Sequence, residues 1–212
     1  MILYISLLLL LLIFGAPASF ARSVTPLNDG WSFRFAHEVS SQGRRVDLPH
    51  TWNAQDALGG NPAYYRGMGV YEKRITPRPE WRNKRVYLKF HGANETAAVF
   101  VNSRFAAEHK GGYTAFVVDI TDMLDYGKEN TLTVKVTNAL DLGVIPLVGD
   151  FNMYGGLYRN VDVVTVDPLH ISLTDYASPG VYMTQRNVSH DKADIDAGVM
   201  VSNSTDVAMD AT

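Results

Sequence analysis

Residues 131–137 read TLTVKVT, a strict alternation of polar and apolar side chains. Because successive side chains of a β-strand point to opposite faces, this stretch predicts a strand that buries Leu132, Val134 and Val136. Residues 86–90 alternate in the same way. Residues 97–101 form a continuous apolar run, which is typical of a strand covered on both faces. The chain is therefore expected to build a sheet with a buried face.

The same pattern continues outward from this stretch in both directions. Further strands are expected at residues 31–35, 69–75, 115–120, 161–166, 170–174 and 195–202. Turn residues separate them, at 28–30, 59–62, 111–112 and 126–128. A short helical turn is expected near residues 122–124, and no long segment follows the 3.6-residue period of a helix. Many short strands between turns predict an all-β fold of two packed sheets.

Composition excludes several classes of function. The chain has 212 residues, 46% of them hydrophobic, and a net charge of −3. It lacks the clustered basic surface that nucleic-acid binding requires, so no nucleic-acid partner is expected. It has no cysteine, which excludes disulfides and cysteine-based metal sites.

The first residues have the features of a targeting segment. Residues 2–14 are almost entirely apolar, and Ser19 and Ala21 occupy the small-residue positions of a signal-peptidase site. Cleavage after Ala21 is expected, with export to the periplasm or beyond and no membrane attachment afterwards. The segment before the apolar run has no Lys or Arg, so an uncleaved anchor is the alternative.

A boundary is expected at Asp167-Pro168, where proline ends the last strand of the first unit. Residues 22–167 then form one domain. Residues 168–212 are too few to close a second sandwich, which takes about 100 residues, and are interpreted as its truncated start. A catalytic (β/α)8 barrel needs about 250 residues and does not fit in this chain.

Three motifs stand out, at residues 48–53 (LPHTWN), 64–73 (YYRGMGVYEK) and 149–161 (GDFNMYGGLYRNV). Together with the segment from Phe90 to Thr121, they resemble the N-terminal sugar-binding domain of family 2 glycoside hydrolases. That family includes β-galactosidases, β-glucuronidases and β-mannosidases. The resemblance covers residues 24–167, with the motifs in the family's order.

The resemblance implies a galactose-binding-like jelly-roll sandwich, followed by an immunoglobulin-like sandwich that is incomplete here and begins near residues 193–203. It also implies a retaining hydrolase whose two catalytic glutamates lie in a barrel beyond this chain. No catalytic residue is therefore assigned, no cofactor is implied, and the missing barrel portion is an expected partner. Carbohydrate, as a β-glycoside or glycan, is the expected ligand.

The resemblance also points to two charged residues that contact substrate. Asp150 precedes a Gly-Gly turn, and in the family an aspartate at this position reaches the sugar at the cleavage site. Arg66 lies between tyrosines and glycines, and its planar donors suit hydroxyls or a carboxylate. From the residues alone, Asp150 could instead cap its own loop, and Arg66 could pair with a loop aspartate.

Asn61 and Trp52 are further substrate-binding candidates. Asn61 precedes a proline and is foremost a turn residue, while Trp52 could stack on a sugar or pack in the core. The family pattern often places Asp before this tryptophan, where this chain has Thr51. His50 and His109 are expected to be structural, and no metal-ligand spacing accompanies them.

Three functions remain open at this point. The leading one is the carbohydrate-binding part of a secreted β-galactosidase-like hydrolase that is not catalytic by itself. The alternatives are a self-sufficient carbohydrate-binding module and a non-functional remnant. The sequence does not identify the sugar.

Overall fold

The computed structural model describes residues 22–39, 42–56, 58, 64–147, 149 and 151–209. The expected targeting segment, residues 1–21, lies outside this part of the chain. The described residues form strands joined by loops and two short 3₁₀ turns.

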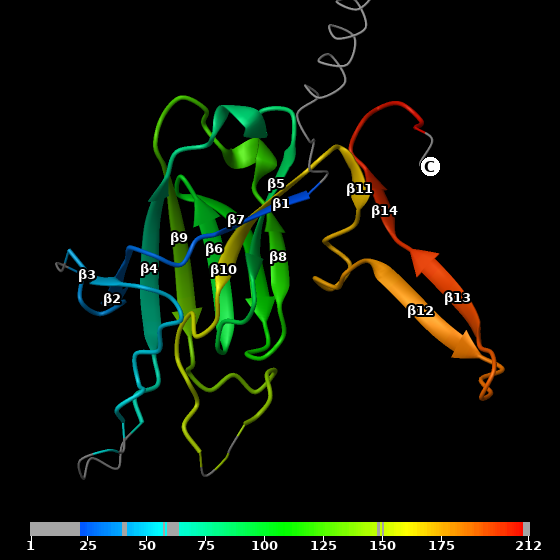
Figure 1. Cartoon of the computed structure of the whole chain (residues 1–212). Coiled ribbons are helices and arrows are strands. Elements are labelled where there is room, and N and C mark those ends of the chain that lie inside the picture. The colour runs from blue at the N-terminus through cyan, green and yellow to red at the C-terminus, as the bar shows by residue number, and fades with distance from the viewer. Residues whose placement is uncertain are drawn as a thin grey trace, which may run out of the picture.

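Six antiparallel strands form the larger sheet, in the order β3-β2-β4-β9-β6-β7 (Figure 1). Its strands are β2 (Trp31–Phe35), β3 (Arg44–Val46), β4 (Met68–Ile75), β6 (Thr96–Val101), β7 (Arg104–Lys110) and β9 (Asn130–Thr137). The smaller sheet has the order β1-β10-β5-β8. Its strands are β1 (Arg22–Pro26), β5 (Arg85–Phe90), β8 (Phe116–Asp119) and β10 (Val161–Val166).

The two sheets pack face to face around one hydrophobic core. Strand β9 contributes Leu132, Val134 and Val136, all fully buried, which confirms the prediction from the alternation in this stretch. Leu88 of β5 and Val163 of β10 belong to the same cluster of buried side chains. The all-β sandwich predicted from the sequence is therefore confirmed.

Strand β6 differs from its prediction as a strand covered on both faces. Ala97, Val99 and Val101 are buried, but Ala98 and Phe100 on the other face are half-buried. Strand β10 is the one buried along its whole length. The reason is tertiary, since the chain after β10 returns over the outer face of the smaller sheet and covers what a two-sheet sandwich would leave exposed.

That returning segment forms a small second cluster. Leu173 packs with Tyr87, Val164 and Val166 on the face of the smaller sheet that points away from the main core. A hydrogen bond from the Arg22 guanidinium to the carbonyl of Ile171, at 2.9 Å, attaches the same segment to β1.

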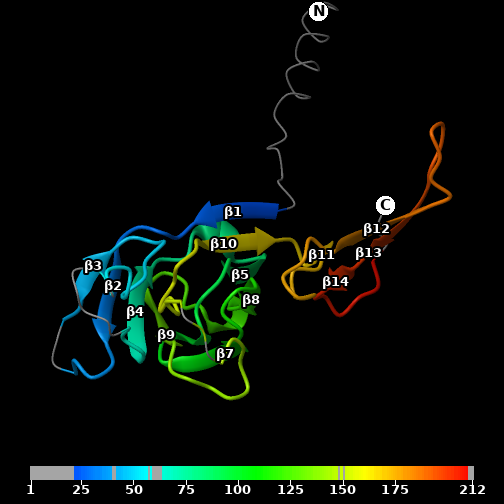
Figure 2. The same ribbon diagram turned by 90° about the horizontal axis from the view of Figure 1, so that it is seen from below.

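The C-terminal segment contains four strands, grouped in two pairs. They are β11 (Leu169–Ile171), β12 (Val181–Arg186), β13 (Asp194–Val199) and β14 (Val201–Asn203), with β11 paired to β14 and β12 to β13. The strand expected at 170–174 ends at Ile171, and the one expected at 195–202 is interrupted at Met200. Figure 2 shows the β12–β13 hairpin projecting from the sandwich, and all its residues are exposed.

Two 3₁₀ turns complete the described structure, η1 (Pro79–Trp81) and η2 (Thr121–Met123). The second matches the helical turn expected near residue 122. Among the described residues, no helix has the length and apolar character to cross a membrane.

Candidate functional site

Three segments that are distant in sequence meet at one end of the sandwich, the lower end in Figure 1. They are the segment after residue 50, the segment before β4, and the long connection from β9 to β10. The His50 amide donates to the Leu157 carbonyl at 2.8 Å, and the Trp52 amide donates to Gly155 at 3.2 Å. The Asn138 amide donates to Gly67 at 3.1 Å. The three sequence motifs therefore share one edge of the molecule.

Buried asparagine side chains hold these segments together. The Asn53 side-chain amide donates to the Met153 carbonyl at 2.9 Å, and its oxygen accepts from the Gly155 amide at 3.0 Å. The Asn138 side chain donates to the same Met153 carbonyl at 2.8 Å and accepts from the Gly67 amide, also at 2.8 Å. Both asparagines are fully buried. Because loops have no sheet ladder to satisfy their backbone groups, these amides supply the missing partners.

Trp52 lies beneath this network and not in the wall of a pocket. Its ring packs 5.9 Å from Phe33, nearly parallel to it. Gly155 and Gly69 approach the same indole so closely that an added Cβ would lie 2.0 Å and 2.7 Å from its ring atoms. Gly155, the first residue of the Gly-Gly turn, therefore has to lack a side chain, because a Cβ atom at this position would displace Trp52.

His50 is half-buried, and its ring packs against Phe33 and Tyr71. Its Nδ1 lies 2.7 Å from the hydroxyl of Tyr71. Burial, with a smaller contribution from Arg44, lowers the pKa of His50 to about 4. Burial raises the pKa of Tyr71, so its hydroxyl keeps its proton and shares a hydrogen bond with the neutral imidazole. His109 is also satisfied, with Nε2 3.1 Å from the Gly111 carbonyl. Both histidines have the structural partners that the sequence analysis expected.

A pocket of about 340 Å³ opens beside the asparagine network. Its lining residues come from the segment before β4 and from the β9–β10 connection: Tyr64, Arg66, Leu140, Leu147, Gly149, Phe151 and Met153. Arg66 is the one charged side chain among these described lining residues.

A buried acid interacts electrostatically with Arg66. Glu95 precedes β6 and is 2% exposed, and its Oε1 atom has no hydrogen-bond partner in the described structure. Burial raises the pKa of Glu95, and the positive charge of Arg66 opposes that shift. The next nearby charge is Asp141, whose carboxylate pairs with Lys110 at 3.0 Å. Arg66 is therefore the positive charge that favours the ionised form of this buried carboxyl group.

The four predicted substrate-binding residues have different outcomes. Asp150 and Asn61 lie outside the described residues. Arg66 lines the pocket, and Trp52 packs against Phe33 and the core. The structure thus places Arg66 and Trp52 at the same end of the sandwich without joining them in one surface.

The sequence analysis missed Asn53, Asn138 and Glu95. Asn53 ends the LPHTWN motif, so its place in a motif was the available signal. Asn138 follows directly after the alternating stretch, where a polar residue reads as an ordinary strand end. Glu95 lies between Asn94 and a strand, and nothing in the local pattern indicates that its carboxyl group is buried.

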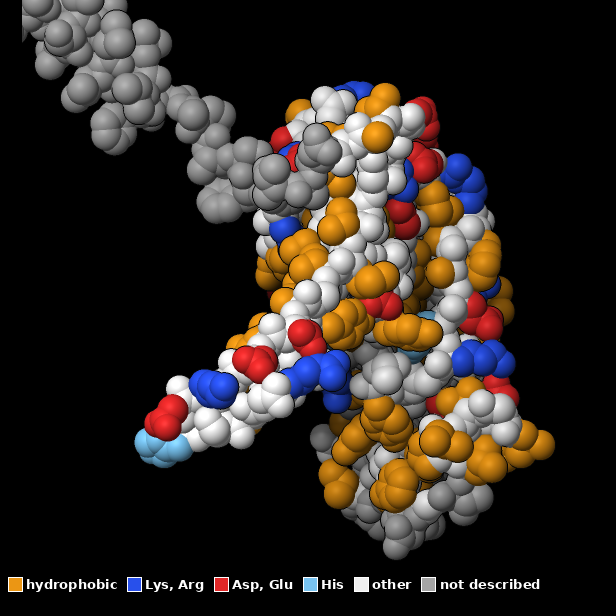
Figure 3. Space-filling model, turned by 90° about the vertical axis from the view of Figure 1, so that its right-hand side faces the viewer, with side chains coloured by type: hydrophobic (Ala, Val, Ile, Leu, Met, Phe, Trp, Pro, Cys, Tyr) orange, Lys and Arg blue, Asp and Glu red, His pale blue; other side chains and the backbone are white. Residues whose placement is uncertain are grey.

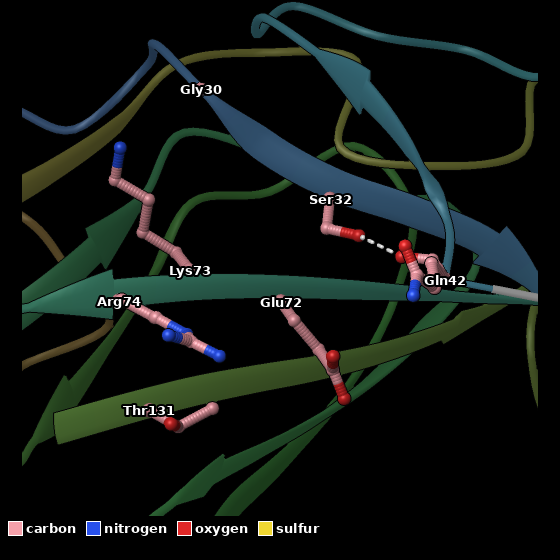
Figure 4. A pocket seen from close by; sticks show the side chains of 7 residues that line it. All are labelled: Gly30, Ser32, Gln42, Glu72, Lys73, Arg74 and Thr131. Carbon is pink, nitrogen blue, oxygen red and sulfur yellow. Dashed lines mark hydrogen bonds between the residues drawn. The ribbon is translucent and has the colours of Figure 1, made fainter.

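A more polar pocket of about 380 Å³ lies elsewhere, where β2 diverges from β4 (Figure 4). It is lined by Gly30, Ser32, Gln42, Glu72, Lys73, Arg74 and Thr131. The Ser32 hydroxyl donates to the Gln42 carbonyl at 3.2 Å, and Arg74 pairs with Glu129 at 3.2 Å. None of the predicted site residues lines it.

Within the described ranges, no group of three or more His, Cys, Asp or Glu side chains could hold a metal ion. Five pockets formed by these residues have at most one carboxylate each in their walls.

Comparison with known proteins gives a consistent result. Residues 29–167 match the family model of the glycosyl hydrolases family 2 sugar binding domain. A β-glucuronidase of Bacteroides fragilis is 50% identical over 199 residues, which cover 94% of this chain and 29% of that protein. A β-galactosidase of Thermoanaerobacter pseudethanolicus is 36% identical over 149 residues, or 68% of this chain and 20% of that protein.

Solved structures agree with these matches. A putative β-galactosidase from Bacteroides fragilis superposes with a TM-score of 0.82 at 39% identity, covering 87% of this chain and 29% of that one. A Bacteroides uniformis β-glucuronidase superposes with a TM-score of 0.79 at 33% identity, covering 86% and 22%. The chain spans less than a third of the length of these relatives. With its sandwich, its ordered motifs and the family match over residues 29–167, the chain belongs to glycoside hydrolase family 2 and contains the family's sugar-binding domain.

Proposed function

We propose that this chain is the carbohydrate-binding part of a secreted family 2 glycoside hydrolase and presents one wall of the substrate pocket. The observation that carries the proposal is the pocket beside Arg66, built from two of the three family motifs. The asparagine network fixes the loops around it, and a fixed site binds a ligand without an ordering cost.

The substrate class follows from the family and from the relatives, which are named β-glucuronidases and β-galactosidases. The proposed ligand is therefore a β-glycoside of glucuronic acid or galactose. Asp150 belongs to the proposal as a second sugar contact, since it lies one residue from both Gly149 and Phe151 in the pocket wall. Asn61 is retained as a weaker contact, whereas Trp52 is not, because its ring packs against Phe33 and the core.

Hydrolysis by this chain alone is not expected. Retaining glycoside hydrolysis needs two carboxyl groups about 5 Å apart across one bond. The pockets of the described residues offer at most one carboxylate each. Catalysis is assigned to a barrel portion of the kind that the family supplies.

The experiment is a calorimetric titration of the purified chain with β-glucuronides, β-galactosides and β-mannosides, followed by an assay with the corresponding nitrophenyl glycosides. Saturable binding of at least one sugar, weakened by Asp150→Ala, and no release of nitrophenol are expected. Turnover by the purified chain would contradict the assignment of catalysis elsewhere. Absence of binding at millimolar concentrations of every sugar would contradict the binding role.

Secretion is tested separately. Sequencing the mature N-terminus of the exported protein should give Arg22 as the first residue. A mature protein that still begins at Met1 would contradict cleavage and favour an anchored form.

A further inference from the structure

The polar pocket where β2 diverges from β4 opens on the outer face of the larger sheet, and its volume is about 380 Å³. Ser32 pairs with Glu72 across β2 and β4, and Arg74 pairs with Thr131 across β4 and β9. Paired residues point to the same face of a sheet, here the face away from the core. The C-terminal segment packs on the smaller sheet, on the opposite side of the sandwich (Figure 2). It therefore leaves this face of the larger sheet open.

Contacts within the protein hold the walls of this pocket in place. The Ser32 hydroxyl donates to the Gln42 carbonyl at 3.2 Å, which attaches the turn between β2 and β3 to the sheet. Gly43 has a positive φ of 71° and lies so close to Ser32 that an added Cβ would overlap its hydroxyl. The Lys73 ammonium donates to the Asp29 carbonyl at the other rim. A pocket formed in advance binds a ligand without the cost of ordering its walls.

The polar groups in the wall suit a ligand rich in hydroxyl groups. Arg74 is already paired with Glu129 at 3.2 Å, which partly offsets its charge. Glu72 is the one carboxylate among the described lining residues, and within the described part of the chain it forms no hydrogen bond or ion pair. A carboxylate accepts hydrogen bonds from two hydroxyls, and the Gln42 amide and Thr131 hydroxyl both donate and accept. Glu72 would repel an anionic ligand, so a neutral one fits better.

An aromatic pair continues the same face beyond the pocket. Glu72 lies opposite Thr133, and Thr133 lies opposite Phe100 on β6. Phe100 in turn lies opposite Phe105 on β7, and the two rings meet edge to face with centroids 5.7 Å apart. The Lys135 ammonium covers the Phe100 ring at 5.0 Å, whereas Phe105 is 60% exposed. Phe105 therefore offers an apolar ring, the kind of surface on which the C–H face of a sugar packs.

The distance between the two features sets the length of the ligand. Three strand spacings separate Glu72 on β4 from Phe105 on β7, or about 14 Å at the usual spacing of neighbouring strands. A single sugar ring covers one feature and does not reach the other. The residue between them on β9 is the small Thr133, so the surface is shallow along this line. An extended chain of several sugars can lie across it.

We infer that the outer face of the larger sheet binds an extended, neutral, β-1,4-linked glycan, with Glu72 and Gln42 holding hydroxyls in the pocket and Phe105 supporting a ring further along the chain. This site goes beyond the proposed function, because none of these residues lines the pocket beside Arg66. A second copy of the protein fits the face less well. Stable interfaces have an apolar centre, and polar side chains occupy this row as far as the aromatic pair.

The test is calorimetric titration of the purified chain with four probes: cellotetraose, β-1,4-mannotetraose, maltotetraose and methyl β-D-glucoside. The first two are extended and long enough to reach both features. Maltotetraose is curved by its α-linkages, and the methyl glucoside is a single ring. Each β-1,4-linked tetraose is expected to bind about tenfold more tightly than either of the others, as one additional favourable contact would produce.

Variants assign the contacts. Phe105→Ser and Glu72→Gln should each weaken cellotetraose binding about tenfold. Both should leave unchanged the binding of methyl β-D-galactoside, which belongs to the pocket beside Arg66. Tyr176→Ser and Glu80→Gln are the matched controls, an exposed aromatic ring and an exposed acid outside this face. Thermal unfolding of each variant shows whether the fold is intact.

The outcomes distinguish this site from the proposed function. Equal binding of all four probes, or cellotetraose binding that survives both variants, would overturn the site. Loss of cellotetraose binding in Asp150→Ala alone would place the tetraose in the pocket beside Arg66, which overturns the second site and leaves the proposed function standing. Tighter binding of dextran sulfate, strengthened by Glu72→Gln, would assign the face to polyanions. Dimerisation that Phe105→Ser abolishes, seen by sedimentation, would assign it to a second copy, and either result would overturn the inference.

Discussion

Asn53 and Asn152 hold each other by two hydrogen bonds across 99 positions of sequence. The side-chain amide of Asn53 donates to the side-chain oxygen of Asn152 at 2.8 Å, and Asn152 donates back to the Asn53 carbonyl at 2.7 Å. The pair joins the segment after the LPHTWN motif to the loop that contains the Gly-Gly turn. The position of the candidate pocket therefore depends on contacts between loops, outside the ladders of the two sheets.

Asn53→Ala is expected to lower the free energy of unfolding by about 3 kcal/mol, because it leaves the buried amide of Gly155 without its acceptor and removes one of the two donors to the Met153 carbonyl. Urea unfolding followed by tryptophan fluorescence measures the change. Asn160→Ala is the control, since Asn160 is exposed. A loss no larger than that of the control would show that the network does not stabilise the loops.

Gly155→Ala is expected to destabilise the protein by about 3 kcal/mol and to change the fluorescence of Trp52. An added Cβ would lie 2.0 Å from the indole ring, so either the ring or the loop must move. Gly198→Ala is the matched control, because nothing lies within 4 Å of the Cβ position there. Unfolding of both variants at the same urea concentration would contradict the close packing of Gly155 against Trp52.

Stability should depend on pH through His50. Its pKa is lowered from 6.5 to about 4 in the folded protein, so between these values the unfolded chain binds the proton more readily. The stabilisation is complete above pH 6.5 and is lost as the pH falls towards 4.

Unfolding in urea at a series of pH values tests this dependence. His50→Gln should flatten the decline, whereas the exposed His190→Gln should leave it unchanged. A decline that persists in full in His50→Gln would assign it to other groups.

Limited trypsin digestion should cut first in the β12–β13 hairpin, after Arg186 or Lys192, because the whole hairpin is exposed. A resistant fragment that contains residues 22–167 is then expected, in agreement with the boundary proposed at Asp167-Pro168. Mass spectrometry of the fragments identifies the order of cuts. Early cleavage after Lys89, in the middle of β5, would contradict a separately stable sandwich.

Much of the sandwich was predictable from sequence, because strand formation follows a local rule. The alternation at residues 131–137 specifies one buried face, and β9 buries the residues it indicates. The strand at residues 161–166 was also predicted, but its burial on both faces was not. That burial depends on Leu173, which a window around the strand does not contain.

Part of the candidate site was likewise predictable from the sequence, and part of it was not. Sequence motifs identified Arg66 as a polar residue between tyrosines and glycines, and they indicated the Gly-Gly turn. They could not show that Glu95 is buried and interacts electrostatically with Arg66, or that Trp52 packs against the core and not in the pocket wall.

By itself, then, the sequence determined the all-β class, most of the strands and the order of the family motifs, because side-chain periodicity and turn residues act over a few neighbouring positions. Only the tertiary structure decided which motifs meet, which faces are covered and what surrounds Arg66. Burial, hydrogen bonding and electrostatic attraction act between groups close in space, and the closest partners of Asn53 lie about a hundred residues away, with 99 positions separating it from Asn152.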